Sequence, residues 1–471
     1  MANIRNQDSW VHSGEPEQAT RKAMDLVRMA VSKVGLLNPL PEIVVGVQQS
    51  ALVIGGGPSG MTTALELADH GFPVHLVERS NLLGGQARFL YNTWKGEPIG
   101  PALQEMDARV RSHPLITLHM ESTVTDAEGF VGNFKSTIQS PRGPQAVDHG
   151  VTVIATGGKG YTPTEYGYGT ADRVYTSIEF DKLTMMGDRR INDAKTFVFI
   201  QCVGSRELGR MYCSRVCCTH SVQAAVQLKE QDPTREIFIL YRDLRTYGER
   251  EELFKKAREK GVVFINYELH GKPRVTQLDP RQLEVVVWDH ILHEPLRIVA
   301  DAVVLATAIV PSSANADLAR IYKLSTDADG FLLEAHAKLR PVDFAGDGLF
   351  MAGLAHYPKS VDEAVAQAKA AAGRAITVLS SDRIGLESTK ATPVLANCDG
   401  CALCLDVCPY HAISLVEEAT AEGSRSSHIQ VNVAQCKGCG MCQATCPKDG
   451  VYVAGFSMEQ ITAQVKAALA L

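Results

Sequence analysis

Eight of the twelve cysteines belong to a spacing that occurs twice near the C-terminal end. The spacing is C-x2-C-x2-C-x3-C-P, first from Cys398 to Pro409 and again from Cys436 to Pro447. Sets of four cysteine thiolates at this spacing bind iron–sulfur clusters, and zinc sites rarely use the doubled arrangement. We therefore expect this end of the chain to fold around two [4Fe–4S] clusters.

The doubled run resembles bacterial two-cluster ferredoxins, in which the fourth cysteine of each run serves the other cluster. Gly400, Gly438 and Gly440 leave room for backbone N–H groups to approach sulfur. Residues 386–396 are predicted to be a linker, and the tail from Ser457 to Leu469 is predicted to be an amphipathic helix. The pattern assigns Cys398, Cys401, Cys404 and Cys446 to one cluster, and Cys436, Cys439, Cys442 and Cys408 to the other.

A glycine fingerprint near the other end predicts a dinucleotide-binding unit. Ala51 to Ile54 is an apolar strand, a GxGxxG turn and a helix follow it, and Glu78 ends the next strand. The three glycines permit a tight turn, approach of the backbone to a pyrophosphate and close helix packing, while the acid accepts from a ribose hydroxyl. Because strand, helix and acid stand at the expected spacing, a purely structural glycine-rich turn is the weaker interpretation.

Later motifs favour FAD over NAD. Gly84-Gly85 follows the acid, small-residue turns end the stretches Val151 to Gly158 and Ala302 to Pro311, and Gly348 leads into a helix from Val361. Together these motifs resemble glutathione-reductase-like flavoproteins over about residues 49–385, which implies a two-dinucleotide-binding α/β fold. The cofactor-binding residues implied are Gly55, Gly57, Pro58, Ser59, Gly60, Glu78, Arg79, Gly84, Gly85, Gln86, Ala155, Thr156, Gly157, Gly353, Lys359 and Ser360.

The second dinucleotide unit of such a fold lacks its glycines here. The strand Thr196 to Gln201 is followed by a loop with four cysteines, and a helix is predicted from Thr219 to Lys229. Nicotinamide binding is therefore not expected at this turn. Four thiolates can hold a [4Fe–4S] cluster or zinc, and the adjacent pair could form a redox disulfide, so the residues alone leave three interpretations open. The cysteines are Cys202, Cys213, Cys217 and Cys218.

Three further motifs resemble the A subunit of heterodisulfide reductase. They are Ser9-Trp10-Val11-His12, CSRVCC at Cys213 to Cys218, and Arg245-Thr246-Tyr247-Gly248. The resemblance spans essentially the whole chain and implies an oxidoreductase component with FAD and three [4Fe–4S] clusters. The third cluster would use Cys202, Cys213, Cys217 and Cys218, so all twelve cysteines become ligands and none is left for a disulfide.

The chain departs from the family pattern at two residues and in the length of its N-terminal region. Asp8 stands where the family predicts a cysteine, Gln223 stands where many relatives have a lysine, and longer members have an additional N-terminal region. We expect a helical extension over 1–48, the FAD-binding domain over 49–190 and 316–385, a degenerate nicotinamide-type domain over 191–315, and a ferredoxin domain with a C-terminal helix over 386–471.

The resemblance also implies how the protein works. FAD would interconvert two-electron and one-electron transfer and could bifurcate electrons, and the clusters would conduct electrons to partners. These would be heterodisulfide reductase B/C-like subunits, a hydrogenase- or formate-dehydrogenase-type donor and ferredoxin, with a homodimer inside a larger hetero-oligomer. A self-contained NAD(P)H-dependent oxidoreductase and a quinone-interacting membrane-bound complex are the alternatives. No catalytic acid or base is evident, although Gln223, His356 and Lys359 are candidates for the flavin neighbourhood, as are Arg245, Tyr247 and Glu249 for the middle domain.

Composition argues against nucleic-acid-binding, membrane-spanning and secreted classes of protein. The net charge is -6 with no basic block, so nucleic acid is not an expected partner. No apolar stretch reaches the roughly 18 residues of a spanning helix, and no secretory signal is visible. Tight C-x2-C spacing without a signal favours metal binding in a reducing compartment, so we expect a cytoplasmic protein.

Overall fold

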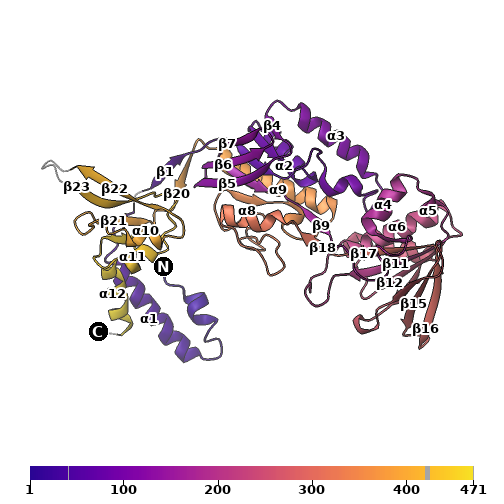
Figure 1. Ribbon diagram of the computed structural model, residues 1–471. Coiled ribbons are helices and arrows are strands. Elements are labelled where there is room, and N and C mark those ends of the chain that lie inside the picture. The colour runs from indigo at the N-terminus through magenta and orange to yellow at the C-terminus, as the bar shows by residue number, and fades with distance from the viewer. Residues whose placement is uncertain (41, 420–424, 470–471) are drawn as a thin grey trace. The chain divides into compact units, whose positions relative to one another are not determined.

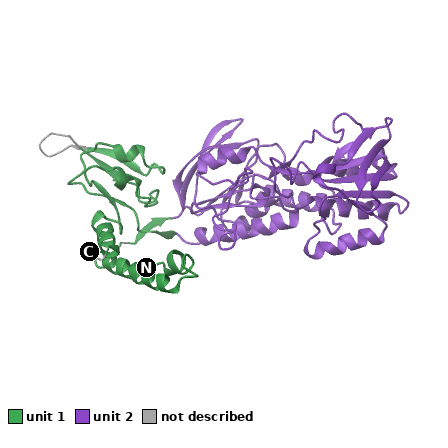
Figure 2. Ribbon diagram, turned by 90° about the horizontal axis from the view of Figure 1, so that it is seen from below, with its two compact units in different colours: residues 1–46, 383–471 green, residues 47–382 purple. Residues whose placement is uncertain are grey.

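The computed structural model describes residues 1–40, 42–419 and 425–469, and the predicted ranges 1–48 and 386–471 each include residues outside this set. The chain divides into two compact units (Figure 2). Unit 1 contains both ends of the chain, residues 1–46 and 383–471, and unit 2 contains residues 47–382. The N-terminal extension and the cysteine-rich end therefore belong to the same unit.

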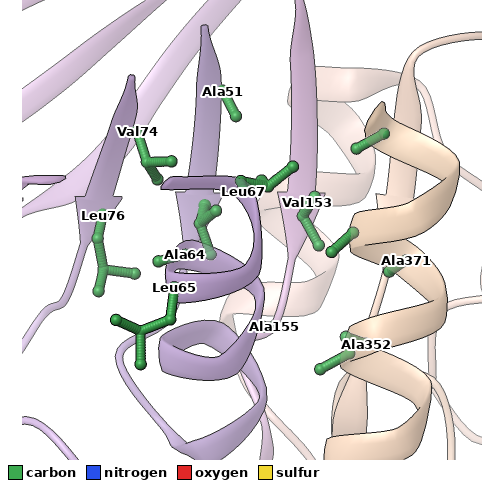
Figure 3. Close-up of a cluster of buried hydrophobic side chains, with 14 of the residues drawn as sticks. Ala51, Ala64, Leu65, Leu67, Val74, Leu76, Val153, Ala155, Ala352 and Ala371 are labelled. Carbon is green, nitrogen blue, oxygen red and sulfur yellow. The ribbon is translucent and has the colours of Figure 1, made fainter. Parts of the chain in front are cut away.

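The first half of unit 2 is built on a five-stranded parallel sheet in the order β19-β8-β2-β3-β4. Its central strand β2 is apolar and buried throughout, as expected for a parallel strand covered on both faces. Figure 3 shows side chains of β2, β3 and β8 meeting helices α2 and α9. The elements are β2 (Ala51–Ile54), α2 (Pro58–Asp69), β3 (Val74–Val77), α3 (Ile99–Ser112), β4 (Ile116–His119), β8 (Val151–Ile154), β19 (Leu349–Met351) and α9 (Val361–Leu379).

Alanines explain how α9 packs against this sheet. Ala364, Ala368, Ala371 and Ala375 are buried along one side of the helix. Their small side chains allow α9 to approach α2 closely, and alanine also has the highest helix propensity. The buried leucines and valines around them each contribute about 1.5–3 kcal/mol, so this cluster holds the first half together.

The second half of unit 2 has a similar sheet in the order β10-β17-β11-β12-β13, again all parallel. Figure 1 labels β17, β11 and β12 of this sheet. In both halves, a three-stranded antiparallel sheet is inserted before the strand that returns next to the first one. The insertions are β5-β6-β7 (Thr123–Phe130, Asn133–Ser140, Gly143–His149) and β14-β15-β16 (Arg274–Gln277, Leu283–Asp289, Glu294–Ala300). The repeat itself comprises β10 (Val174–Thr176), α4 (Ser177–Met185), β11 (Thr196–Val203), α6 (Cys217–Gln231), β12 (Glu236–Tyr241), α7 (Glu251–Glu259), β13 (Val263–Asn266) and β17 (Ala302–Thr307).

Unit 1 joins the two ends of the chain. Helix α1 packs against α12, where the Gln460 amide donates to the Leu36 carbonyl at 2.9 Å and the Lys33 ammonium lies 3.5 Å from the Phe456 ring centre. Two of its strand pairs connect distant segments, β1 with β20 and β21 with β24. The elements are α1 (Pro16–Val34), β1 (Ile43–Gly46), β20 (Arg383–Leu386), β21 (Ala391–Pro393), α10 (Leu403–Asp406), β22 (Ile413–Ala419), β23 (Arg425–Val431), α11 (Met441–Thr445), β24 (Val451–Val453) and α12 (Met458–Ala468).

The two parallel sheets and the cysteine-rich end confirm the predicted α/β fold class with a C-terminal cluster domain. The expectation of a linker over 386–396 needs correction, because β20 ends at Leu386 and β21 occupies Ala391–Pro393. Each pairs with a distant strand, which sequence periodicity over so few residues cannot indicate. Shorter elements connect the rest, including β9 (Gly158–Gly160), β18 (Ile309–Pro311), α5 (Arg189–Asn192) and α8 (Ala314–Tyr322).

Candidate redox site

A cavity of about 300 Å³ lies in unit 2 at the carboxyl ends of strands from both halves. Its lining includes Gly57 after β2, Glu78 after β3, Ala155 after β8 and Thr307 at the end of β17. The edge formed by the carboxyl ends of parallel strands is where open α/β sheets bind ligands. All predicted cofactor-binding residues except Gly60, Gly84 and Gly353 line this one cavity.

The glycine turn after β2 has the backbone geometry that the fingerprint predicts. Gly55 has φ +113°, and a Cβ there would lie 2.3 Å from the Ala155 carbonyl oxygen. A Cβ on Gly60 would lie 1.7 Å from the Gly55 carbonyl oxygen, so Gly60 permits close packing of α2 behind the turn. A Cβ on Gly57 would meet nothing within 4 Å, because Gly57 stands at the wall of the cavity. The turn thus leaves open space where a pyrophosphate would approach the backbone.

Glu78 is buried and shapes the same turn. One carboxylate oxygen accepts from the Gly56 N–H at 2.7 Å, and the other accepts from the N–H and hydroxyl of Ser80, each at 2.8 Å. The oxygen that accepts from Gly56 has a second lone pair, so Glu78 can still accept from a ligand hydroxyl. The acid therefore has a structural function in addition to the binding function predicted for it.

The four cysteines from Cys202 to Cys218 lie near one another, since the other three thiols all act on the pKa of Cys217, and Cys217 itself lines the cavity. Cys202 lies at a bulge near the end of β11 with φ +61°, and bulges often redirect a side chain. Cys217 and Cys218 occupy the first turn of α6, and Cys217 lines the cavity. Helix α6 begins at Cys217, two residues earlier than predicted, so the adjacent cysteines belong to the helix rather than to the loop.

Burial is the main electrostatic feature of these thiols. It raises the pKa of Cys217 well above its usual value and the pKa of Cys218 to about 12, and the other thiols add to the increase in both cases. Thiols in such surroundings stay protonated at neutral pH unless a cation binds among them, and iron or zinc supplies that positive charge. No disulfide joins any of the twelve cysteines in this structure.

The loop between Cys202 and Cys217 is held by contacts to both halves of unit 2. Tyr212 donates to the Ile309 carbonyl at 2.7 Å, and the Ile309 N–H donates to the Ser214 hydroxyl at 2.9 Å. Arg215 forms an ion pair with Glu363 at 3.1 Å, in the first turn of α9. The cysteine loop is therefore fixed against the helix that begins beside the cavity.

A second group of contacts involves the Arg245-to-Gly248 motif. Tyr247 donates to Glu363 at 2.7 Å, and the buried Arg250 donates to the Ser360 hydroxyl at 2.8 Å and forms an ion pair with Asp362 at 3.2 Å. The motif predicted to shape the middle domain thus contacts the start of α9. Tyr247 contacts the start of α9 at Glu363, and Arg250 contacts it at Ser360 and Asp362. Of Tyr247 and Arg250, only Arg250 lines the cavity.

One contact at the cavity wall was not predicted from the sequence. His220, on α6, lines the cavity and contacts Asp181 of α4 with Nε2 3.0 Å from each carboxylate oxygen. Asp181 also accepts from the Tyr91 N–H at 3.1 Å. Burial opposes charge on His220, but the Asp181 carboxylate outweighs it and raises the histidine pKa. The two residues lie 39 positions apart, so no local pattern links them.

The three candidates for the flavin neighbourhood have different positions. Gln223 and Lys359 both line the cavity. His356 contacts Glu334 at 2.9 Å and Gln367 at 2.7 Å, and it is not among the described residues that form the cavity wall. Of these three candidates, Gln223 and Lys359 therefore lie at the cavity wall, and His356 lies in the segment between β19 and α9.

The cysteine-rich end of unit 1 gathers its eight thiols into two sets. Gly450 donates its N–H to the Cys446 sulfur at 3.2 Å and Gly438 donates to the Cys436 sulfur at 3.4 Å, contacts of the kind that tune cluster potentials. Each set lines one small cavity and mixes cysteines from both runs. The sets are Cys398, Cys401, Cys404 and Cys446, and Cys408, Cys436, Cys439 and Cys442.

Two family models match segments of the chain. Residues 397–449 match a 4Fe-4S dicluster domain, and residues 53–96 match an NAD(P)-binding Rossmann-like domain. No helix among the described residues has the length and apolar character to cross a bilayer, and no three described His, Cys, Asp or Glu side chains are placed to bind a single metal ion. Fold and matches together define an iron–sulfur oxidoreductase component with dinucleotide-binding architecture.

Similar curated proteins show which family of iron–sulfur oxidoreductases the chain belongs to. The A subunit of the H(2):CoB-CoM heterodisulfide,ferredoxin reductase of Methanothermobacter thermautotrophicus is 36% identical, with 100% of this chain and 84% of that protein covered. The A subunit of the H(2)/formate:CoB-CoM heterodisulfide,ferredoxin reductase of Methanococcus maripaludis is 32% identical, with 89% and 77% covered. Among solved structures, Lactococcus lactis thioredoxin reductase is 18% identical, covers 71% of this chain and 99% of its own, and gives a TM-score of 0.49. The chain belongs to the family of heterodisulfide reductase A subunits.

Proposed function

We propose that this chain is the FAD and iron–sulfur electron-transfer component of a heterodisulfide-reductase-type complex. The observation that carries the proposal is one shared cavity. Its wall contains the glycine turn at Gly57 and the thiol-bearing residue Cys217 from the second half. A dinucleotide cofactor on that turn and a cluster on those thiols would be neighbours, so electrons could pass between them.

The residues present suit both groups. For FAD, the open space at Gly57 would receive the pyrophosphate, Glu78 would accept from a ribose hydroxyl, and Lys359 and Ser360 would line the same cavity. For a third [4Fe–4S] cluster, Cys202, Cys213, Cys217 and Cys218 supply four thiolates. FAD supplies the exchange between two-electron and one-electron chemistry, and this chain's residues bind it and exclude water.

The partners follow from the family and from the names of its members. We propose heterodisulfide reductase B/C-like subunits, a hydrogenase- or formate-dehydrogenase-type donor and ferredoxin as partners, and a homodimer within the larger assembly. Names that contain hydrogen, formate, ferredoxin and heterodisulfide support this set. Electron bifurcation at the flavin is part of the same proposal, and a quinone-interacting complex is the alternative assembly.

Cofactor content tests the proposal directly. After anoxic reconstitution we expect one FAD and about 12 iron atoms per chain, as three [4Fe–4S] clusters require. Cys213→Ser should reduce iron to about 8 atoms per chain and retain FAD, and Cys401→Ser serves as the matched variant in the other unit. Elemental analysis and EPR are the measurements. Zinc in place of the third set of irons, or unchanged iron in Cys213→Ser, would contradict the third cluster.

An anoxic titration with NADH and NADPH distinguishes the proposed function from the main alternative, a self-contained NAD(P)H-dependent oxidoreductase. The loop after β11 has no GxGxxG, so we expect neither nucleotide to reduce the flavin rapidly, whereas a one-electron donor should do so through the clusters. Rapid bleaching of flavin absorbance by either nucleotide would instead support a self-contained NAD(P)H-dependent oxidoreductase.

A further inference from the structure

Lys359 is a buried lysine at the wall of the cavity. It precedes α9 and its side-chain ammonium donates to the carbonyl oxygens of Gly353 at 2.6 Å and Tyr357 at 2.7 Å. An ammonium has three N–H groups, so two are used by these carbonyls. The remaining position on nitrogen is an N–H in the charged form and a lone pair in the neutral form, and it is available to a group bound in the cavity.

The charged groups around Lys359 leave its charge poorly balanced. Glu363 forms its ion pair with Arg215 at 3.1 Å, and Glu334 forms its own with His356 at 2.9 Å. Burial, and then Arg215, lower the pKa of Lys359 to about 7, while Glu363 and Glu334 raise it less. Lys359 in turn lowers the pKa of His356, after the larger effect of burial.

We propose that Lys359 takes up a proton when the cofactor in this cavity is reduced and releases it when the cofactor is oxidised. Its ammonium would then balance the negative charge that the electrons bring. This inference rests on the proposed function, in which the cavity binds FAD and the cysteine-bound cluster delivers electrons one at a time. The physical reason is that negative charge added to a water-poor site favours the charged form of an adjacent amine.

The proton balance is simple. For each pair of electrons from the one-electron carriers, one proton passes from solvent to the Lys359 amine, in addition to the proton that a flavin binds on two-electron reduction. Apart from the flavin's own N–H bond, the only bond that forms is an N–H bond on Lys359, and it breaks when the electrons leave. Below about pH 7 the lysine is already protonated before reduction, so the additional uptake is confined to higher pH.

The test is a spectroelectrochemical titration of the flavin in the anoxic holoprotein at several pH values, after its FAD content has been measured. In the wild type above about pH 7, each pH unit should change the equilibrium constant for two-electron reduction by a further factor of ten, which is about 30 mV. A wild-type protein that takes up only the flavin's own proton over the whole range overturns the inference without any variant.

Two substitutions distinguish proton uptake from a merely structural role. Lys359→Met and Lys359→Arg should both lose the additional pH dependence, because neither side chain titrates in this range. Their potentials should move in opposite directions: Lys359→Met below the wild type at pH values under about 7, and Lys359→Arg above it at higher pH. If Lys359→Met does not retain FAD, Lys359→Arg carries the comparison.

A matched control comes from the same helix. Lys369 of α9 is largely exposed and forms an ion pair with Glu66 at 3.0 Å, so Lys369→Met should keep the wild-type pH dependence. Wild-type pH dependence in Lys359→Met and Lys359→Arg would overturn the inference. A wild type that binds no FAD would overturn the proposed function as well, whereas FAD-replete protein without the additional proton overturns the inference alone.

Discussion

Gly57 and Gly60 belong to one turn, but a side chain at each position would meet different surroundings. At Gly60 a methyl group would collide with the Gly55 carbonyl, which is backbone and cannot move aside. At Gly57 it would enter open space at the wall of the cavity. The first glycine thus affects ligand access and the second affects the packing of α2.

This difference predicts opposite outcomes for two alanine substitutions. Gly60→Ala should lower the free energy of unfolding by about 1–3 kcal/mol through overpacking. Gly57→Ala should change it by less than about 0.5 kcal/mol but weaken FAD retention, because the methyl group occupies the space next to the pyrophosphate. Urea denaturation and bound-FAD quantification are the measurements. Equal losses of stability in both variants would contradict the assignment of ligand access to Gly57 and of helix packing to Gly60.

At the scale of single residues, candidate ligand residues could be predicted from the sequence, and the residues that support them could not. Cysteine and glycine spacing is set by the geometry of the group bound, so Cys398 to Cys446 and the turn at Gly55 were predicted from the sequence. Supports such as the Arg215–Glu363 pair join residues 148 positions apart. Only the tertiary fold brings them together, as it does for His220 and Asp181.

At the scale of elements, the two short helices α10 and α11 each contribute a cysteine to a different one of the two thiol sets of unit 1. Cys404 lies in α10 and Cys442 in α11, and each run sends its last cysteine to the other set. Burial raises the pKa of Cys442 to about 11, which leaves its thiol protonated without a cation. Each cluster would therefore tie the two halves of the cysteine-rich end together.

The crossed arrangement predicts paired phenotypes. Cys446→Ser should perturb the same cluster as Cys404→Ser, and Cys408→Ser should perturb the other one together with Cys442→Ser. EPR of the reduced protein can compare the four variants, with signals of the unaffected cluster as the internal control. The arrangement is refuted if Cys446→Ser instead resembles Cys442→Ser.

Helices and strands were predicted where amphipathic or apolar patterns run long enough. The tail helix α12 and the apolar strand β2 are examples, since the pattern of each extends over the whole element. The strands of β5-β6-β7 and the short strands β20 and β21 were not predicted. Their stability comes from pairing with distant segments, which local sequence does not record.

At the scale of the whole molecule, the two ends of the chain form one unit and the middle forms the other. In unit 1, Gln460 is buried, helps to cap α12 and donates to the Leu36 carbonyl just beyond the end of α1. This side chain therefore links the two terminal helices, and their packing depends on it.

We therefore predict two calorimetric transitions. Gln460→Ala should lower one of them by several degrees, since loss of a cap and a buried hydrogen bond costs about 1–2 kcal/mol. The other transition, which should coincide with FAD release, should stay unchanged, and the exposed Lys466→Ala on the same helix should affect neither. A single transition that shifts as a whole would show that the units do not unfold separately.

The two halves of unit 2 share the order of four parallel strands and one pattern of insertion, yet the turns after β2 and β11 differ in kind. One turn presents glycines and backbone N–H groups, and the other presents thiols. Both turns follow strands of similar parallel sheets, so the kind of group that each sheet edge can bind depends on the residues of one loop. A change of residues in such a loop therefore changes the class of ligand while the register of the neighbouring strands stays the same.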